Sequence, residues 1–326
     1  MKLDKHGRFV GRRLRNDRFF QLLLVLLVAS VVWWSFDPVG FGSWRGAGSR
    51  IGHVQHKDLT EISGIVLSRR NPGVIWAHND SGGIARVFAL NTDGTHLGIF
   101  PLTGARAIDW EDIAIGPGPA PGIDYLYVAD TGNNNLARDV VTVYRVPEPL
   151  LDRKSSVGTR SLNGAEALPF RFPGSPHECE TLLVDPLTAD LYLVSRDRNA
   201  RQSGNSFVFR SPAPHKPGAP RTLELVASFP VPAEIKGGDI SPDGRMILLR
   251  AHSARRQVKA LLWNWERKDT PLAQVFREPG HRVPVHHEPQ GEAIAFSADG
   301  QSYFTVGEGL TAPIYRYEVP PPAPGR

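Results

Sequence analysis

Short runs of alternating apolar and polar residues, separated by turn dipeptides, make up most of the chain after residue 50. Asp93-Gly94, Asp243-Gly244 and Asp299-Gly300 are three of these dipeptides. Alternation with a period of two predicts strands with one face toward a core, and Asp-Gly dipeptides predict tight hairpins between them. The pattern therefore predicts an all-β domain built from many hairpins.

Five segments of this region are similar to one another. They are EISGIVLS from Glu61, DWEDIAIG from Asp109, ECETLLVDP from Glu178, EIKGGDISPDG from Glu234 and QGEAIAFSADG from Gln290. Their first residues are 48, 69, 56 and 56 positions apart. Further strand patterns follow each segment, as in the four-stranded blades of a β-propeller. The fifth repeat reaches the Pro-rich tail, residues 319–326, before a fourth strand can form.

The fourth strand of the fifth blade can come from residues 51–56, which precede the first repeat and have no blade of their own. Pairing this strand with the last blade would close the ring and remove an exposed sheet edge. We therefore expect an all-β fold at residues 51–318, a β-propeller of five four-stranded blades closed by an N-terminal strand. A propeller with another number of blades and a two-sheet sandwich are the alternatives, but a sandwich does not explain five similar units.

The N-terminus carries a separate signal. Residues 19–36, FFQLLLVLLVASVVWWSF, are apolar and about long enough to cross a bilayer. Residues 1–18 hold seven Lys or Arg and two Asp, a net charge of +5. The positive-inside rule then predicts a single-pass signal anchor in the cell membrane, with a cytoplasmic N-terminus and an exocytoplasmic propeller. A cleaved signal peptide is the alternative, and residues 37–50 form a Gly- and Ser-containing linker in either case.

The charge of the propeller follows by difference. The whole chain also carries +5, so the 31 basic and 31 acidic residues after position 18 balance. A balanced domain gives no support to nucleic-acid binding. The single cysteine, Cys179, cannot form an intramolecular disulfide, so the fold depends on its own core.

The propeller geometry predicts which side chains surround one end of the central channel. The first strand of each blade lines the channel, and the second runs antiparallel to it, so first-strand starts and second-strand ends meet at one rim. The first strands begin with four acids and an amide, at Glu61, Asp109, Glu178, Glu234 and Gln290. Two positions further on come Ser63, Glu111, Glu180, Lys236 and Glu292. The second strands add His78, Asp80, Asp130, Arg196 and Arg250.

Carboxylates crowded at a channel mouth repel one another unless a cation or basic side chains neutralise them. An all-oxygen set of carboxylates and amides suits Ca²⁺. The candidate metal ligands are Asp109, Glu111, Asp112, Asp130, Glu180 and Glu292. The alternative is structural: acids at strand starts can cap turns, and Lys236 or Arg196 can neutralise them.

Familiar catalytic signatures are absent from the sequence, which contains no G-x-S-x-G, P-loop or H-E-x-x-H motif. His78, beside Asp80 at the expected rim, is the candidate for acid/base chemistry if the protein is an enzyme.

The motifs EISGI, HNDSG, DWEDIA, ADTGNNN, ETLLVDP, DISPDG and GEAIAF resemble those of bacterial secreted propellers of the phytase-like and "esterase-like activity of phytase" kind. The resemblance implies calcium at one channel mouth and basic side chains that hold substrate phosphates. The resemblance then implies that the residues near the metal are Asp109, Glu111, Asp112, Asp130 and Glu180. It implies that the residues that hold the phosphates are Lys236, Arg196 and Arg250. Five expected blades, against six in that family, leave the substrate open.

Two functions follow as expectations. In the first, the mouth binds a cell-envelope ligand or partner protein without catalysis. In the second, the protein is a metal-dependent hydrolase of a small phosphoester or carboxylester, in which a cation-activated water attacks the ester.

Overall fold

The computed structural model describes residues 48–80, 82–152, 158–196, 205–230, 233–253, 258–267, 270–288 and 290–321. The expected membrane anchor and its basic tail lie outside these residues. Within the described residues, no helix has the length and apolar character needed to cross a membrane.

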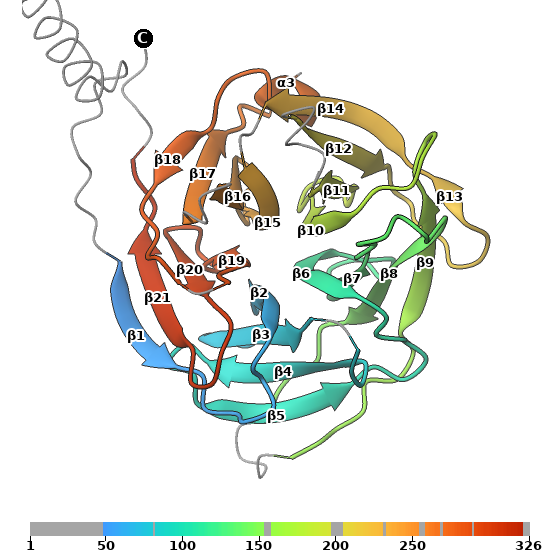
Figure 1. Cartoon of the computed structure of the whole chain (residues 1–326). Helices are drawn as coiled ribbons and strands as arrows, with labels where there is room; N and C mark the ends of the chain where they lie inside the picture. The colour runs from blue at the N-terminus through green and yellow to red at the C-terminus, as the bar shows by residue number, and fades with distance from the viewer. Residues whose placement is uncertain are drawn as a thin grey trace, which may run out of the picture. The chain divides into compact units, whose positions relative to one another are not determined.

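Five β-sheets surround a common axis, as Figure 1 shows. The first blade consists of β2 (Ile62–Leu67), β3 (Val74–Asn79), β4 (Arg86–Asn91) and β5 (His96–Pro101). The second consists of β6 (Trp110–Pro117), β7 (Asp124–Asp130), β8 (Val141–Pro147) and β9 (Glu166–Arg171), with the short β13 (Arg221–Thr222) added in parallel at its outer edge. The third consists of β10 (Cys179–Val184), β11 (Leu191–Ser195), β12 (Asn205–Ser211) and β14 (Glu224–Pro230).

The fourth blade consists of β15 (Ala233–Ile240), β16 (Met246–Ser253), β17 (Val258–Asn264) and β18 (His281–Val283), and the short helix α3 (Leu272–Val275) precedes β18. The fifth consists of β19 (Ala293–Phe296), β20 (Ser302–Val306), β21 (Pro313–Glu318) and the N-terminal strand β1 (Ser49–His53). The all-β propeller of five four-stranded blades is therefore confirmed.

The closure of the ring by the N-terminal strand is also confirmed. β1 pairs antiparallel with β21, from Ser49 opposite Arg316 to His53 opposite Pro313. The strand lies at residues 49–53 rather than 51–56. Its pairing covers the outer edge of the last blade, which would otherwise be open to association with other chains.

The blades are held together by apolar side chains packed between neighbouring sheets. All six residues of β2 are buried, so this inner strand has no face toward solvent, unlike a half-buried strand with alternating exposure. Trp76 and Trp110 are among the largest fully buried side chains and lie in the apolar cluster between the first two blades. Each blade thus buries both of its faces, and the stability of the ring depends on every junction.

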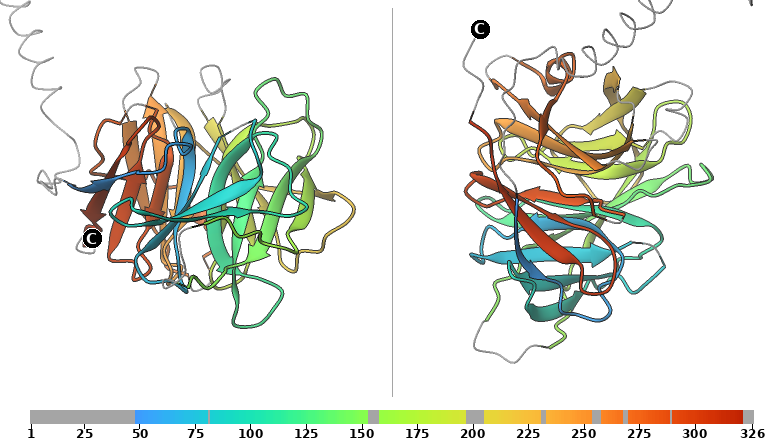
Figure 2. Two further views of the ribbon diagram at one scale, coloured as in Figure 1. Left: turned by 90° about the horizontal axis from the view of Figure 1, so that it is seen from below. Right: turned by 60° about the vertical axis from the view of Figure 1, so that its left-hand side comes forward.

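The inner strands all begin on the same side of the ring. β2 begins at Ile62 opposite Asn79, the last residue of β3, and β6 begins at Trp110 opposite Asp130, the last residue of β7. We call this side, where inner strands begin and second strands end, the mouth face. The side views in Figure 2 show loops on both sides of the ring of sheets.

Candidate functional site

A β-bulge at the start of four inner strands positions the residues that surround the channel. In β6, Trp110 lies opposite Asp130 and Asp112 opposite Ala129, so Glu111 is an extra residue without a partner. The same irregularity leaves Ser63, Glu180 and Lys236 as the extra residues of β2, β10 and β15. A bulge bends the strand locally and redirects the side chain of its extra residue. In the fifth blade, Glu292 immediately precedes β19.

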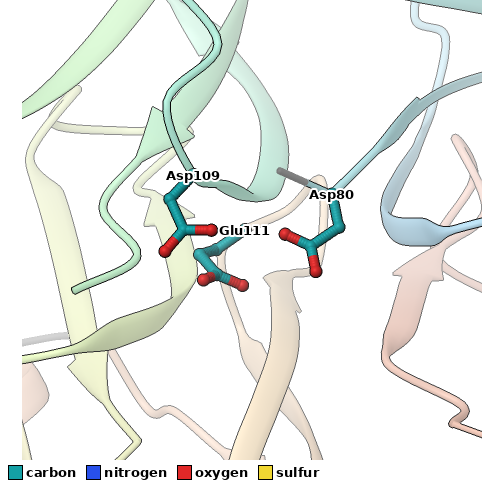
Figure 3. Close-up of side chains that lie close together, drawn as sticks. All are labelled: Asp80, Asp109 and Glu111. Atoms are coloured by element: carbon teal, nitrogen blue, oxygen red, sulfur yellow. The ribbon is translucent and has the colours of Figure 1, made fainter. Parts of the chain in front are cut away.

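Three carboxylates meet on the mouth face between the first two blades. Asp80 follows β3, Asp109 precedes β6, and Glu111 is the bulge residue of β6. One carboxylate oxygen from each lies within 4.8 Å of the others, and Figure 3 shows the three side chains grouped together. We call this group the Asp80 triad. Glu111 belongs to a second group as well, with Glu180 and Glu292.

Basic side chains neutralise the second group. The Lys236 ammonium lies 2.7 Å from a carboxylate oxygen of Glu180 and 2.7 Å from one of Glu292. Arg196 pairs with Glu180 and, at 3.1 Å, with Glu234. Among the described residues, no ion pair is found for Asp109 or Glu111 of the Asp80 triad. The mouth is therefore asymmetric, with compensated carboxylates on the third to fifth blades and an acidic group on the first two.

Glu111 is the centre of this asymmetry. It is 4 % exposed, and no hydrogen bond to its carboxylate is found in the described part of the chain. Burial, followed by repulsion from Asp80 and Asp109, raises the pKa of Glu111 well above its ordinary value. A Cβ atom on Gly132 would lie 2.2 Å from the Glu111 carboxylate, so the ADTGNNN turn can pass this close only with glycine.

Asp112 and Asp130, two of the expected metal ligands, are engaged elsewhere. Asp112 accepts hydrogen bonds from the backbone N–H groups of Ile113 and Leu182, both at 2.9 Å, and so joins the second blade to the third. Asp130 pairs with Arg138 at 2.9 Å and accepts the N–H of Asp109 at 3.0 Å. These contacts are structural, as expected if the acids bond to backbone N–H groups or pair with basic side chains. We therefore leave both residues out of the cation site.

Two expected reactive residues lie inside the protein. His78 is fully buried, and burial lowers the pKa of its imidazole to about 4, which keeps the ring neutral. Arg250 is also fully buried: it pairs with Glu288 and donates to the carbonyl of Ala293 at 2.7 Å. Both side chains are closed off from solvent, whereas Asp80 and Arg196 are partly exposed, so His78 and Arg250 are not in a position to meet a ligand.

The sequence interpretation did not assign the ion-pair partners of two candidate residues, Asp130 and Arg250. Arg138 pairs with Asp130, and Glu288 pairs with Arg250. The eight-residue separation of Asp130 and Arg138 within one hairpin loop could have suggested the first pair. The second joins β16 to the connection between β18 and β19, 38 residues further along the chain, so nothing local in the sequence signals it.

Comparisons with known proteins assign the chain to no family. No protein-family model matches the chain, and no curated protein matches it. Among solved structures, the chain is similar to the WD40 repeats of RRP9, with a TM-score of 0.41 and 9 % identity over 82 % of this chain and 97 % of that one. It is also similar to Raptor of Chaetomium thermophilum, with a TM-score of 0.41 and 9 % identity, covering 86 % of this chain and 29 % of that one.

Proposed function

We propose that the protein is a binding propeller whose mouth holds a divalent cation, Ca²⁺, at the Asp80 triad and presents it to a cell-envelope ligand. The observation that carries this proposal is Glu111, a nearly buried carboxylate next to Asp80 and Asp109, for which the described residues provide no ion pair and no hydrogen bond. A buried carboxylate with two partly buried acids beside it is costly to ionise. Oxygen-only ligands suit calcium, which would remove that cost.

The choice of these three residues also rests on what the other acids do. Glu180 and Glu292 already share Lys236, and Asp112 and Asp130 already accept backbone or guanidinium hydrogen bonds. The NH₂ group of Asn134 donates a hydrogen bond of 3.3 Å to a carboxylate oxygen of Asp109. A cation at the triad would leave coordination positions for water or for an oxygen of the ligand.

Calcium should stabilise the protein, and Glu111→Gln should remove most of that effect. A cation that binds only the folded state adds about 2.7 kcal/mol at a hundredfold excess over its Kd. Thermal melting of the full chain in nonionic detergent, with calcium and with chelator, measures the difference. Glu318→Gln is the matched control, since Glu318 is an exposed acid at the far end of β21.

The pH dependence of this variant follows from the raised pKa of Glu111. A carboxyl group with a raised pKa in the folded state holds its proton when the unfolded chain has lost it, so its contribution to stability falls as pH rises through that window. Glu111→Gln should therefore make the calcium-free protein more stable than wild type at pH 8. Identical melting with calcium, magnesium, manganese and chelator would eliminate the cation site.

A metal-dependent ester hydrolase is the second candidate. Glu111 favours it, because a carboxyl group with a raised pKa beside a cation site can exchange a proton with bound water. The phytase-like resemblance of the motifs supports the same reading. Since His78 is buried, Glu111 is the acid/base candidate, with Lys236 as a nearby positive charge. A screen of phosphate and carboxylate esters, with and without calcium, separates the two functions.

We also propose that residues 19–36 anchor the protein in the cell membrane, with the propeller outside the cytoplasm. The basic residues 1–18 and the apolar run support this orientation. A reporter enzyme that is active only outside the cytoplasm, fused after Arg326, should be active in a bacterial host and remain in the membrane fraction. A shortened, soluble fusion protein would instead indicate a cleaved signal peptide.

A further inference from the structure

A small pocket opens on the mouth face beside the Asp80 triad. It lies between the loop that follows β3 and the start of β6, and its volume is about 120 Å³. The lining residues used below are Glu61, Asp80, Ile84, Arg86, Phe88 and Trp110. Sites for drug-sized molecules usually measure about 300–1,000 Å³. This pocket is therefore of a size for one side chain.

The chemistry of the pocket is that of a receptor for a basic side chain. Glu61 and Asp80 supply carboxylates, while Ile84, Phe88 and Trp110 supply apolar atoms. The lining cation, Arg86, lies 4.9 Å from the centre of the Phe88 ring and pairs with Asp58 at 3.5 Å. The long side chains of Lys and Arg place an aliphatic stem on apolar surface and a charged end among carboxylates.

The surroundings of the pocket add both charge and apolar surface. Burial and repulsion from Glu292, Asp80 and Glu61 raise the pKa of Glu308, so Glu308 lies near enough to both lining acids to interact with them. Ile84 is 68 % exposed, and Leu310 is 73 % exposed. The loop that carries Leu310 is tied to the residue before Glu61 by a 2.7 Å hydrogen bond from the Gly309 N–H to the Thr60 carbonyl. These two side chains offer exposed apolar surface on which a partner could pack.

We propose that this pocket binds a lysine or arginine side chain of a partner protein, and that apolar residues flanking it in the partner pack on Ile84 and Leu310. Charge complementarity selects this partner: carboxylates surround the pocket and its lining cation already has an acidic neighbour. Asp80 belongs to both the pocket and the Asp80 triad, whereas Glu61 belongs to the pocket alone, so binding of the basic side chain is measured without calcium and is probed at Glu61. A melting experiment that eliminated the cation site would leave this one unchanged.

The test is a fluorescence-polarisation array of labelled pentapeptides with the full chain in nonionic detergent and chelator. The central residue is Lys, Arg, acetyl-lysine or citrulline, and the flanking positions combine Leu, Ile, Phe and Gly. The best Lys or Arg peptide should bind about tenfold more tightly than its neutral counterpart, and its binding should weaken with salt. Peptides with apolar flanks should bind more tightly than those with Gly.

Three variants locate the binding on the protein. Glu61→Gln and Ile84→Ser should each weaken the best peptide about fivefold to tenfold, since each removes one kind of contact. Leu187→Ser is the matched control: Leu187 is 61 % exposed in the β10–β11 turn, at the opposite end of the inner strand, and binding should not change. Equal binding of charged and neutral peptides, no binding across the array, or an equal loss in all three variants would each overturn the proposal.

Discussion

Replacing Arg250 by methionine should lower the free energy of unfolding by about 3–5 kcal/mol, because it leaves a buried carboxylate without its partner. Arg250 and Glu288 are both almost completely buried. The guanidinium also donates to the carbonyls of Ala293 at 2.7 Å and Val306 at 3.1 Å, which lie in the next blade. The substitution therefore removes an ion pair and two hydrogen bonds across one junction of the ring. Urea unfolding of the full chain in detergent measures the loss.

A double variant distinguishes two causes of the lost stability, an unpaired buried charge and lost packing. Arg250→Met combined with Glu288→Leu removes both charges and should recover part of the loss, with the two carbonyls still unsatisfied. Arg316→Met is the surface control, because Arg316 and Glu318 are both about half exposed, and it should cost less than about 1 kcal/mol. If the double variant is no more stable than the single one, the buried charge of Glu288 is not the cause.

Lys236→Met should have the second largest effect, a loss of about 3 kcal/mol at pH 8 without calcium. Lys236 is 6 % exposed and is shared by Glu180 and Glu292. Its charge also lowers the pKa of Glu111, so the variant would hold three crowded acids with less compensation. Urea unfolding of the wild type and the variant gives the difference directly.

The loss in Lys236→Met should depend on pH in a defined direction. Without the ammonium, the folded-state pKa values of the neighbouring carboxyl groups rise, so the variant loses stability as pH rises and approaches the wild type near pH 4. Lys57→Met, at an exposed position, is the control and should show no such slope. A loss of the same size at pH 4 and pH 8 would mean that the side chain contributes through packing.

The sequence alone determined the architecture, because the features that define a propeller are local and recur. Five segments with similar starts predicted five inner strands, and an unpaired strand before the first repeat predicted the closure that β1 and β21 make. The same alignment placed Glu61, Asp109 and Glu111 at one rim. Each of these inferences needs only the period of a strand and the order of elements along the chain.

Only the tertiary structure decided what each rim residue does. The period of two would place Asp109 and Glu111 on one side of a regular strand, whereas the bulge makes Glu111 an extra residue that meets Asp80 from another blade. Asp112 and Glu111 are adjacent acids in one motif, yet Asp112 bonds to the backbone of the next blade and Glu111 has no such bond in the described residues. Lys236 lies between two acids that are 56 residues before it and 56 after it. Compensation of charge depends on distances between blades, and those distances are set by the packing of the whole ring rather than by any local pattern.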